Sequence, residues 1–97
     1  MKDITISEIQ IIPVKPQNGL VAFASAVIND QIYIGNLAIY TSLASKNEYR
    51  LVYPSKILPT GKQVQCIHPI TKKAGKSIQA AIIKKYQLLM KKCNDNN

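Results

Sequence analysis

Few residues in this chain could perform acid–base or nucleophilic chemistry. The 97 residues include five acidic side chains and a single histidine, and the acids are scattered. General acid–base catalysis needs titratable groups held close together, so the sequence disfavours an enzyme. One nucleophile-like pair, Cys66 and His68, would share a face if that segment were a strand, which is the basis of a thiol-enzyme hypothesis. The alternative is a structural His68 whose ring bonds to a backbone carbonyl. We expect no enzymatic activity and no small-molecule substrate.

The cysteines and glycines do not form cofactor-binding patterns. Cys66 and Cys93 make neither a disulfide framework nor a spaced Cys/His metal motif, so we expect free thiols in a reducing compartment. The four glycines are too dispersed for a phosphate-binding loop. The first ten residues lack the apolar stretch of a signal peptide, and no apolar run approaches the roughly 18 residues that span a bilayer. We expect no metal, no cofactor, no membrane partner and a cytoplasmic location.

The basic residues favour a different chemistry, the binding of a polyanion. Thirteen Lys and Arg against five Asp and Glu give a net charge of +8. Residues 1–45 hold two basic and three acidic groups, whereas residues 46–97 hold eleven basic and two acidic groups. This asymmetry is typical of a nucleic-acid partner. The alternative is that the lysines only keep a small helix soluble.

The first half of the chain has the pattern of β-strands. Apolar residues alternate in two phases over Ile4–Val14, which predicts a strand with a bulge near Ser7 and Glu8. Turn residues follow over Lys15–Gly19, and Pro13 indicates an edge position. Leu20–Ile28 is apolar throughout, as in a central strand. Asn29 and Asp30 predict a two-residue hairpin to Ile32–Tyr40, with a bend or bulge at Gly35.

The second half changes from strands to a helix. Tyr49–Tyr53 predicts a short strand, and Pro54–Gly61 an ordered loop or one helical turn. Lys62–Ile67 could return as another short strand. From residue 71 the apolar period is helical. Its buried stripe would contain Ile78, Ile82, Tyr86 and Leu89, flanked by Ile83 and Met90.

Lysines occupy the opposite side of that helix. Lys84 and Lys91 lie within about 20° of Lys73 on a helical wheel, and no acid interrupts them. Lys72 and Lys73 stand in the first turn, where the helix dipole disfavours cations. A bound phosphate would offset that cost, because the same helix end attracts anions.

The tyrosines leave two interpretations open. Tyr49 and Tyr53 lie close in sequence to Arg50 and Lys56, so they could be stacking platforms for single-stranded bases. Alternatively they pack in the core or the sheet, as half-buried tyrosines commonly do.

Together these elements predict one α+β domain over residues 1–97. An antiparallel sheet of four to five strands, about residues 3–67, would precede an amphipathic C-terminal helix, about residues 71–92, packed on one face. Its edges would invite pairing, because Leu20–Ile28 and Ile32–Tyr40 carry few charges. We therefore expect a two-fold homodimer joined through the sheets. A rival hypothesis is a protein-interaction module that adds a partner strand to an exposed edge.

A series of short motifs between residues 49 and 89 resembles the stage V sporulation protein G (SpoVG) family. They are Pro54-Ser55-Lys56, Pro59, Gly61, His68-Pro69-Ile70, Ile78-Gln79 and Tyr86. The likeness extends more loosely over residues 3–90. It implies a small bacterial cytoplasmic protein that binds DNA or RNA, dimerises through its sheet, and regulates gene expression, sporulation or septation.

The resemblance also bears on the candidate contacts. Lys56 matches the lysine of the family's Pro-Ser-Lys-Arg loop, and Ile57 stands where the family usually has arginine. From this match and the lysine-rich segments we expect phosphate contacts from Lys56, Lys62, Lys72, Lys73 and Lys76, with Arg50 and Lys84 as additional candidates.

Overall fold

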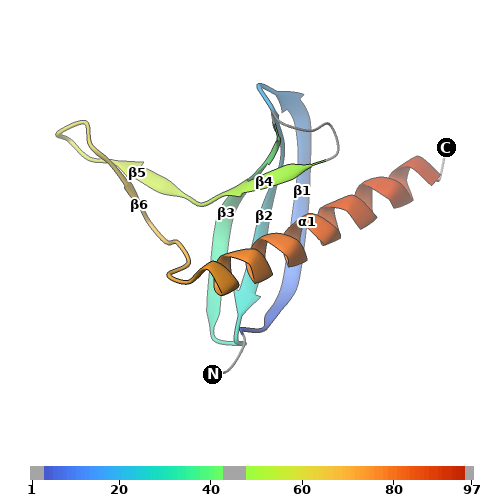
Figure 1. The fold of residues 1–97 in the computed structure, drawn as a ribbon. Coiled ribbons are helices and arrows are strands. Elements are labelled where there is room, and N and C mark those ends of the chain that lie inside the picture. The colour runs from blue at the N-terminus through green and yellow to red at the C-terminus, as the bar shows by residue number, and fades with distance from the viewer. Residues whose placement is uncertain (1–3, 43–47, 96–97) are drawn as a thin grey trace.

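The structure is a computed structural model that describes residues 4–42 and 48–95, with side chains as far as Lys91. In chain order the elements are β1 (Ile6–Gln17), β2 (Leu20–Ile28), β3 (Ile32–Thr41), β4 (Tyr49–Val52), β5 (Ser55–Ile57), β6 (Gln63–Gln65) and α1 (Lys72–Asp95). Strands β1 to β4 form an antiparallel sheet in sequence order, and α1 crosses one of its faces (Figure 1). The predicted α+β class is confirmed.

Two tight turns set the order of the first three strands. Asn18 and Gly19, with φ of 54° and 90°, connect β1 to β2, so β1 continues through Lys15 to Gln17, where the sequence predicted a turn. Asn29 and Asp30 also have positive φ. Residues 29–31 separate β2 from β3, one residue more than the predicted hairpin. Such left-handed conformations suit Asn, Asp and Gly, which explains these residue types.

Two bulges flank the middle of β2, and both were predicted. In β1 the register shifts between Ser7 and Gln10, with Glu8 at φ 48°. In β3 it shifts beside Gly35, with Asn36 at φ 57°. Bulges bend a strand and increase its twist. The sheet therefore curves at the level of Ser25 and Ala26, which lie opposite both irregularities.

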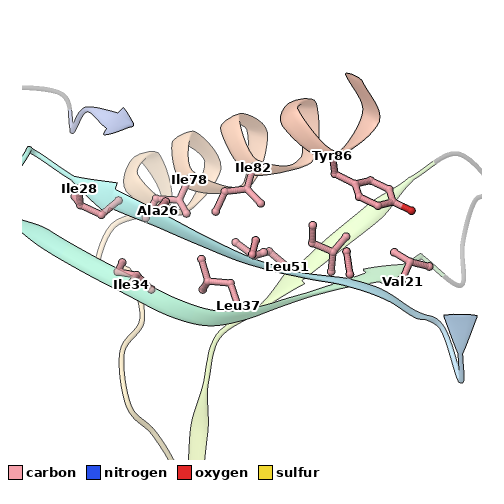
Figure 2. Packing of buried hydrophobic residues seen from close by; sticks show 12 residues of the cluster. Val21, Ala26, Ile28, Ile34, Leu37, Leu51, Ile78, Ile82 and Tyr86 are labelled. Carbon is pink, nitrogen blue, oxygen red and sulfur yellow. The ribbon is translucent and has the colours of Figure 1, made fainter. Parts of the chain in front are cut away.

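The core lies between α1 and the sheet (Figure 2). Ala22, Ala24 and Ala26 of β2 are buried, and their small side chains leave room for the helix. The helix contributes Ile78, Ile82 and Tyr86, as the helical period predicted. Ile83 and Met90 pack against this cluster. Leu89 is only half-buried.

The other face of the sheet, here called the open face, has no helix over it. Strand register aligns Ile12, Phe23, Ala38 and Val52 in one row across all four strands. Ile12 is 63% exposed and Phe23 38% exposed. The prediction of a central strand over Leu20–Ile28 is confirmed, and so is the edge position of Pro13, because the edges are β1 and β4. The expectation that β2 and β3 offer edges for pairing is wrong, since both are central. The apolar surface available for pairing with another molecule is therefore the open face, and not an edge of β2 or β3.

Strands β5 and β6 pair with each other in a separate two-stranded sheet, here called the arm. It projects away from the four-stranded sheet, on the side where α1 begins (Figure 1). The prediction of a loop or helical turn over Pro54–Gly61 is wrong, because Ser55–Ile57 is a strand. The predicted return strand within Lys62–Ile67 is confirmed as Gln63–Gln65, although it extends the arm and not the main sheet.

Replacing Ile82 by Ala should destabilise the protein strongly. The Ile82 side chain is fully buried where α1 crosses the sheet. Truncation there removes buried apolar surface and leaves a cavity, which typically costs about 2–5 kcal/mol. Leu88→Ala is the matched control on the same helix, because Leu88 is 56% exposed. Urea unfolding followed by circular dichroism measures both. Equal midpoints for the two variants would contradict the described packing.

Candidate nucleic-acid interface

The five lysines expected to contact phosphates are all exposed, and they fall into two groups. Lys56 and Lys62 belong to the arm. Lys72, Lys73 and Lys76 belong to the first turns of α1. The arm and the start of α1, which carry these two groups, lie on the same side of the molecule and are connected by residues 66–71 (Figure 1). From Tyr49 to Asn94 the chain contains no acidic residue, so this side is basic without interruption along the sequence.

Backbone hydrogen bonds define the shape of the arm. Its tip is closed by Leu58, whose N–H donates to the Lys62 carbonyl at 2.8 Å and whose carbonyl accepts from Gly61 at 2.8 Å. Gly61 has φ 90°, a left-handed conformation that glycine adopts without strain. At the base, Cys66 N–H donates to the Pro54 carbonyl at 2.9 Å. Lys62 therefore stands at the tip and Lys56 within β5.

The start of α1 is held by a capping residue and by a close contact. Thr71 Oγ1 accepts a hydrogen bond from Ala74 N–H at 3.1 Å, which is N-cap geometry. A Cβ on Gly75 would lie 3.2 Å from Pro69 Cγ, so glycine lets the segment after the arm pack against the helix. No acidic residue occupies the first turn. The first turn therefore carries Lys72 and Lys73 at the positive end of the helix dipole, an arrangement that a bound anion would stabilise.

An open groove of about 920 Å³ lies beside this helix start. Tyr49, Tyr53, Pro69, Ile70 and Ile83 supply its apolar lining. The charged groups that line it are Lys72, Lys76, Lys84 and Glu48. Lys84, an additional candidate from the sequence, thus joins the helix group.

The two tyrosines of the groove also pack against the core. The rings of Tyr49 and Tyr86 meet edge to face, with centroids 5.1 Å apart. Tyr53 Oη is buried and has no hydrogen-bond partner in the described part of the chain. Burial raises the pKa of Tyr53, and burial together with the nearby Tyr49 raises the pKa of Tyr86. These contacts favour the packing interpretation of Tyr49 and Tyr53.

Arg50 lies apart from both lysine groups. It pairs with Tyr40 across β3 and β4, and its guanidinium carbon lies 5.1 Å from the Tyr40 ring centroid. The neighbouring Tyr49 faces α1, so alternation along the strand places Arg50 on the open face. A contact from Arg50 would need a nucleic acid that reaches around the sheet.

The thiol-enzyme hypothesis loses its geometric basis. Strand β6 ends at Gln65, so Cys66 and His68 are not alternate residues of a strand. Cys66 is an exposed free thiol, and His68 is exposed. The His68 ring makes no hydrogen bond to the described residues, and these residues contain no cluster of three or more potential metal ligands.

Sequence reasoning missed the arm and the groove. The arm brings Gln63 and Gln65 of β6 opposite Ile57 and Ser55 of β5. The available signal was the Pro59-Thr60-Gly61 turn between two short segments. The groove has no local signal, because its walls come from β4, the segment before α1, and α1 itself.

A known protein family matches most of this chain. The profile of the SpoVG family matches residues 4–88, which covers β1 to β6 and most of α1. The chain belongs to the SpoVG family. It is therefore a SpoVG-type regulatory protein, and a connection to sporulation fits the family's name. Comparison with curated proteins gave no match. In the part of the chain that the structure describes, no helix is long and apolar enough to cross a membrane.

Replacing Tyr53 by Phe should stabilise the protein by roughly 1 kcal/mol, because a buried hydroxyl without a partner carries a desolvation cost. Tyr33→Phe is the control, since Tyr33 is 71% exposed and its hydroxyl can be hydrated. Urea unfolding at neutral pH measures both variants. Destabilisation of Tyr53→Phe would show that the hydroxyl has a partner.

Tyr53→Phe should also reduce the loss of folding stability at alkaline pH. The folded-state pKa of Tyr53 is raised above the ordinary value of 10.0. Its contribution is therefore complete below pH 10 and is lost as pH rises through the raised pKa, because the unfolded chain releases the proton first. The wild-type free energy of unfolding should fall above pH 10, and the Tyr53→Phe curve should fall less. If the free energies of unfolding of the two proteins fell in parallel above pH 10, the raised pKa of Tyr53 would be contradicted.

Proposed function

We propose that this SpoVG-family protein binds nucleic acid as a homodimer, mainly through lysine–phosphate contacts, and regulates gene expression in that way. The observation that carries the proposal is the basic side of the molecule. The arm and the start of α1 carry five exposed lysines in a segment without acids from residue 49 to residue 94, and Glu48 lines the groove beside the helix group. If the lysines of α1 served only solubility, i,i+4 pairs of Glu and Lys would keep the helix soluble and also stabilise it. The chain has no acid between residues 49 and 94, so α1 has no such pair before Asp95, which follows Lys91 by four residues.

The type of cation indicates how binding would work. Lysine carries a compact charge on a flexible stem, which suits phosphate oxygens but recognises base edges less well than the planar fork of arginine. Arg50 is the chain's one arginine, and it faces away from the lysine groups. Most of the affinity should therefore be electrostatic and should decrease as salt increases.

The open face supports the homodimer. Its row of Ile12, Phe23, Ala38 and Val52 is apolar, and residues 1–45 carry almost no net charge. Strand β4 also places Arg50 on this face, against the Tyr40 ring. Two copies can approach there without opposing their lysines. A two-fold axis would place the same row against itself and leave the arm and α1 of each copy outside the interface. Two lysine surfaces on one dimer then bind one nucleic acid more tightly than either alone.

The rival protein-interaction hypothesis requires an accessible strand edge. The β1 edge carries Pro13, Pro16 and the bulge at Glu8, features that obstruct strand addition. The β4 edge has only four residues. A nucleic-acid titration without binding at low salt would favour this rival over the proposed function.

Salt titration of DNA or RNA binding is the main test of the proposed function. With five phosphate contacts, the logarithm of affinity should fall with the logarithm of salt at a slope of about −4. Replacing Lys72 and Lys73 by Ala should reduce the slope by about 2. Lys15→Ala is the control, because Lys15 is an exposed lysine on β1. Fluorescence anisotropy measures all three proteins. A wild-type slope near zero would exclude the proposal.

Replacing Phe23 by Glu should convert the dimer to monomers, because it buries a charge at the centre of the proposed interface. Leu88→Glu introduces the same charge on the exposed side of α1 and should leave the dimer intact. Light scattering at micromolar concentration gives the masses. A wild-type mass near 10.8 kDa would exclude the homodimer, and a dimeric Phe23→Glu variant would exclude this face as its interface.

A further inference from the structure

The arm has two chemically different faces. Register pairs Ser55 with Gln65 and Ile57 with Gln63, and these four side chains share one face, here called the reading face. The other face carries Lys56 opposite Val64. All four side chains of the reading face are exposed, and Ile57 is 70% exposed. An apolar side chain between uncharged polar groups thus faces solvent on a projecting hairpin.

One amide of the reading face is already oriented. Gln63 Nε2 donates to Ser55 Oγ at 2.6 Å, across the two strands. This bond fixes the rotamer of Gln63 and leaves its carbonyl oxygen as a free acceptor. Gln65 stands opposite Ser55 on the same face. The hairpin therefore presents the Gln63 amide in a fixed position beside an exposed Gln65, and fixing one of the two amides lowers the entropy cost of recognition.

We propose that the reading face enters the major groove of B-form DNA and contacts base edges there. This inference rests on the proposed function, and it specifies the nucleic acid. The B-form major groove admits a two-stranded β-ribbon, whereas the minor groove is about half as wide. The deep, narrow major groove of duplex RNA does not admit such an element. The arm is a ribbon of this kind, and its projection from the body leaves it free to enter a groove (Figure 1).

The side chains of the reading face match the edges of A·T pairs. A glutamine amide can pair with N6 and N7 of adenine, and an apolar side chain can contact the thymine methyl group. Gln65 and Gln63 supply the amides, and Ile57 supplies the apolar contact. Lys62 at the tip and the lysines of α1 then meet the phosphates on either side of the groove. Affinity and sequence preference thereby come from different residues.

The test begins with duplex DNA selected from a random pool by the wild-type protein. The affinities for the selected duplex and for a scrambled duplex are measured for wild type, Gln65→Ala and Ile57→Ala. The ratio of the two affinities is the sequence preference. A good bidentate base contact contributes about 1–3 kcal/mol of discrimination, so Gln65→Ala should lose roughly 5- to 150-fold of the preference. Ile57→Ala should also reduce the preference. Val64→Ala, on the opposite face of the arm, is the matched control and should retain the sequence preference. Lys62→Ala, at the tip of the arm, should weaken the binding of both duplexes equally.

Base analogues test the same contacts without changing the protein. Replacing adenine by 7-deazaadenine removes the N7 acceptor, and replacing thymine by uracil removes the methyl group, so each should weaken wild-type binding to the selected duplex. Tighter binding of DNA than of the matching RNA duplex is expected.

Two outcomes would overturn the inference while leaving nucleic-acid binding intact. One is an unchanged preference in Gln65→Ala and Ile57→Ala together with no effect of the analogues. The other is equal or tighter binding of duplex RNA or of single strands. A wild-type protein that binds no nucleic acid at low salt would instead exclude the proposed function itself.

Discussion

The packing of one helix on the alanine row of β2 governs the rest of this structure. Ala22, Ala24 and Ala26 lie in the same buried cluster as the fully buried Ile82, and the backbone of α1 approaches β1 and β4 at the two sides of the sheet. This contact uses Ile78, Ile82 and Tyr86 of the helix's apolar stripe, so the lysines on the opposite side of the helix face solvent. It also covers only one face of the sheet. Both candidate surfaces, the lysine side and the open face, are consequences of this one layer of packing.

The segment between the arm and α1 transmits that packing to the candidate interface. Thr71 caps the helix, and Gly75 allows Pro69 to pack against it, so the chain leaves the helix start in a defined direction. The bond from Cys66 to Pro54 closes the base of the arm a few residues earlier. The two lysine groups are therefore positioned by short-range contacts, although they belong to different elements.

Much of the fold follows from periodicity alone. The two-phase alternation around Ser7 and Glu8 predicted the first bulge, and the helical period predicted Ile78, Ile82 and Tyr86 as the buried stripe. The arm could not be predicted in this way, because three-residue strands are too short to show a period. The exposure of the lysines was predictable from their charge. Their division into two groups was not, since it depends on the path of residues 66–71 in space.

The arm explains how a departure from the family pattern can be tolerated. Ile57 stands where the resemblance to the SpoVG family leads one to expect arginine, and this substitution removes one cation from the basic side. Residue 57 lies on the reading face, opposite the face that carries Lys56. If the arm enters a groove, the side chain at this position contacts base edges and not phosphates. At such a position arginine would favour guanine, whereas isoleucine favours the thymine methyl group. The exchange then alters which sequence is preferred more than how strongly the backbone is held, because the lysines at the tip and on α1 are unchanged.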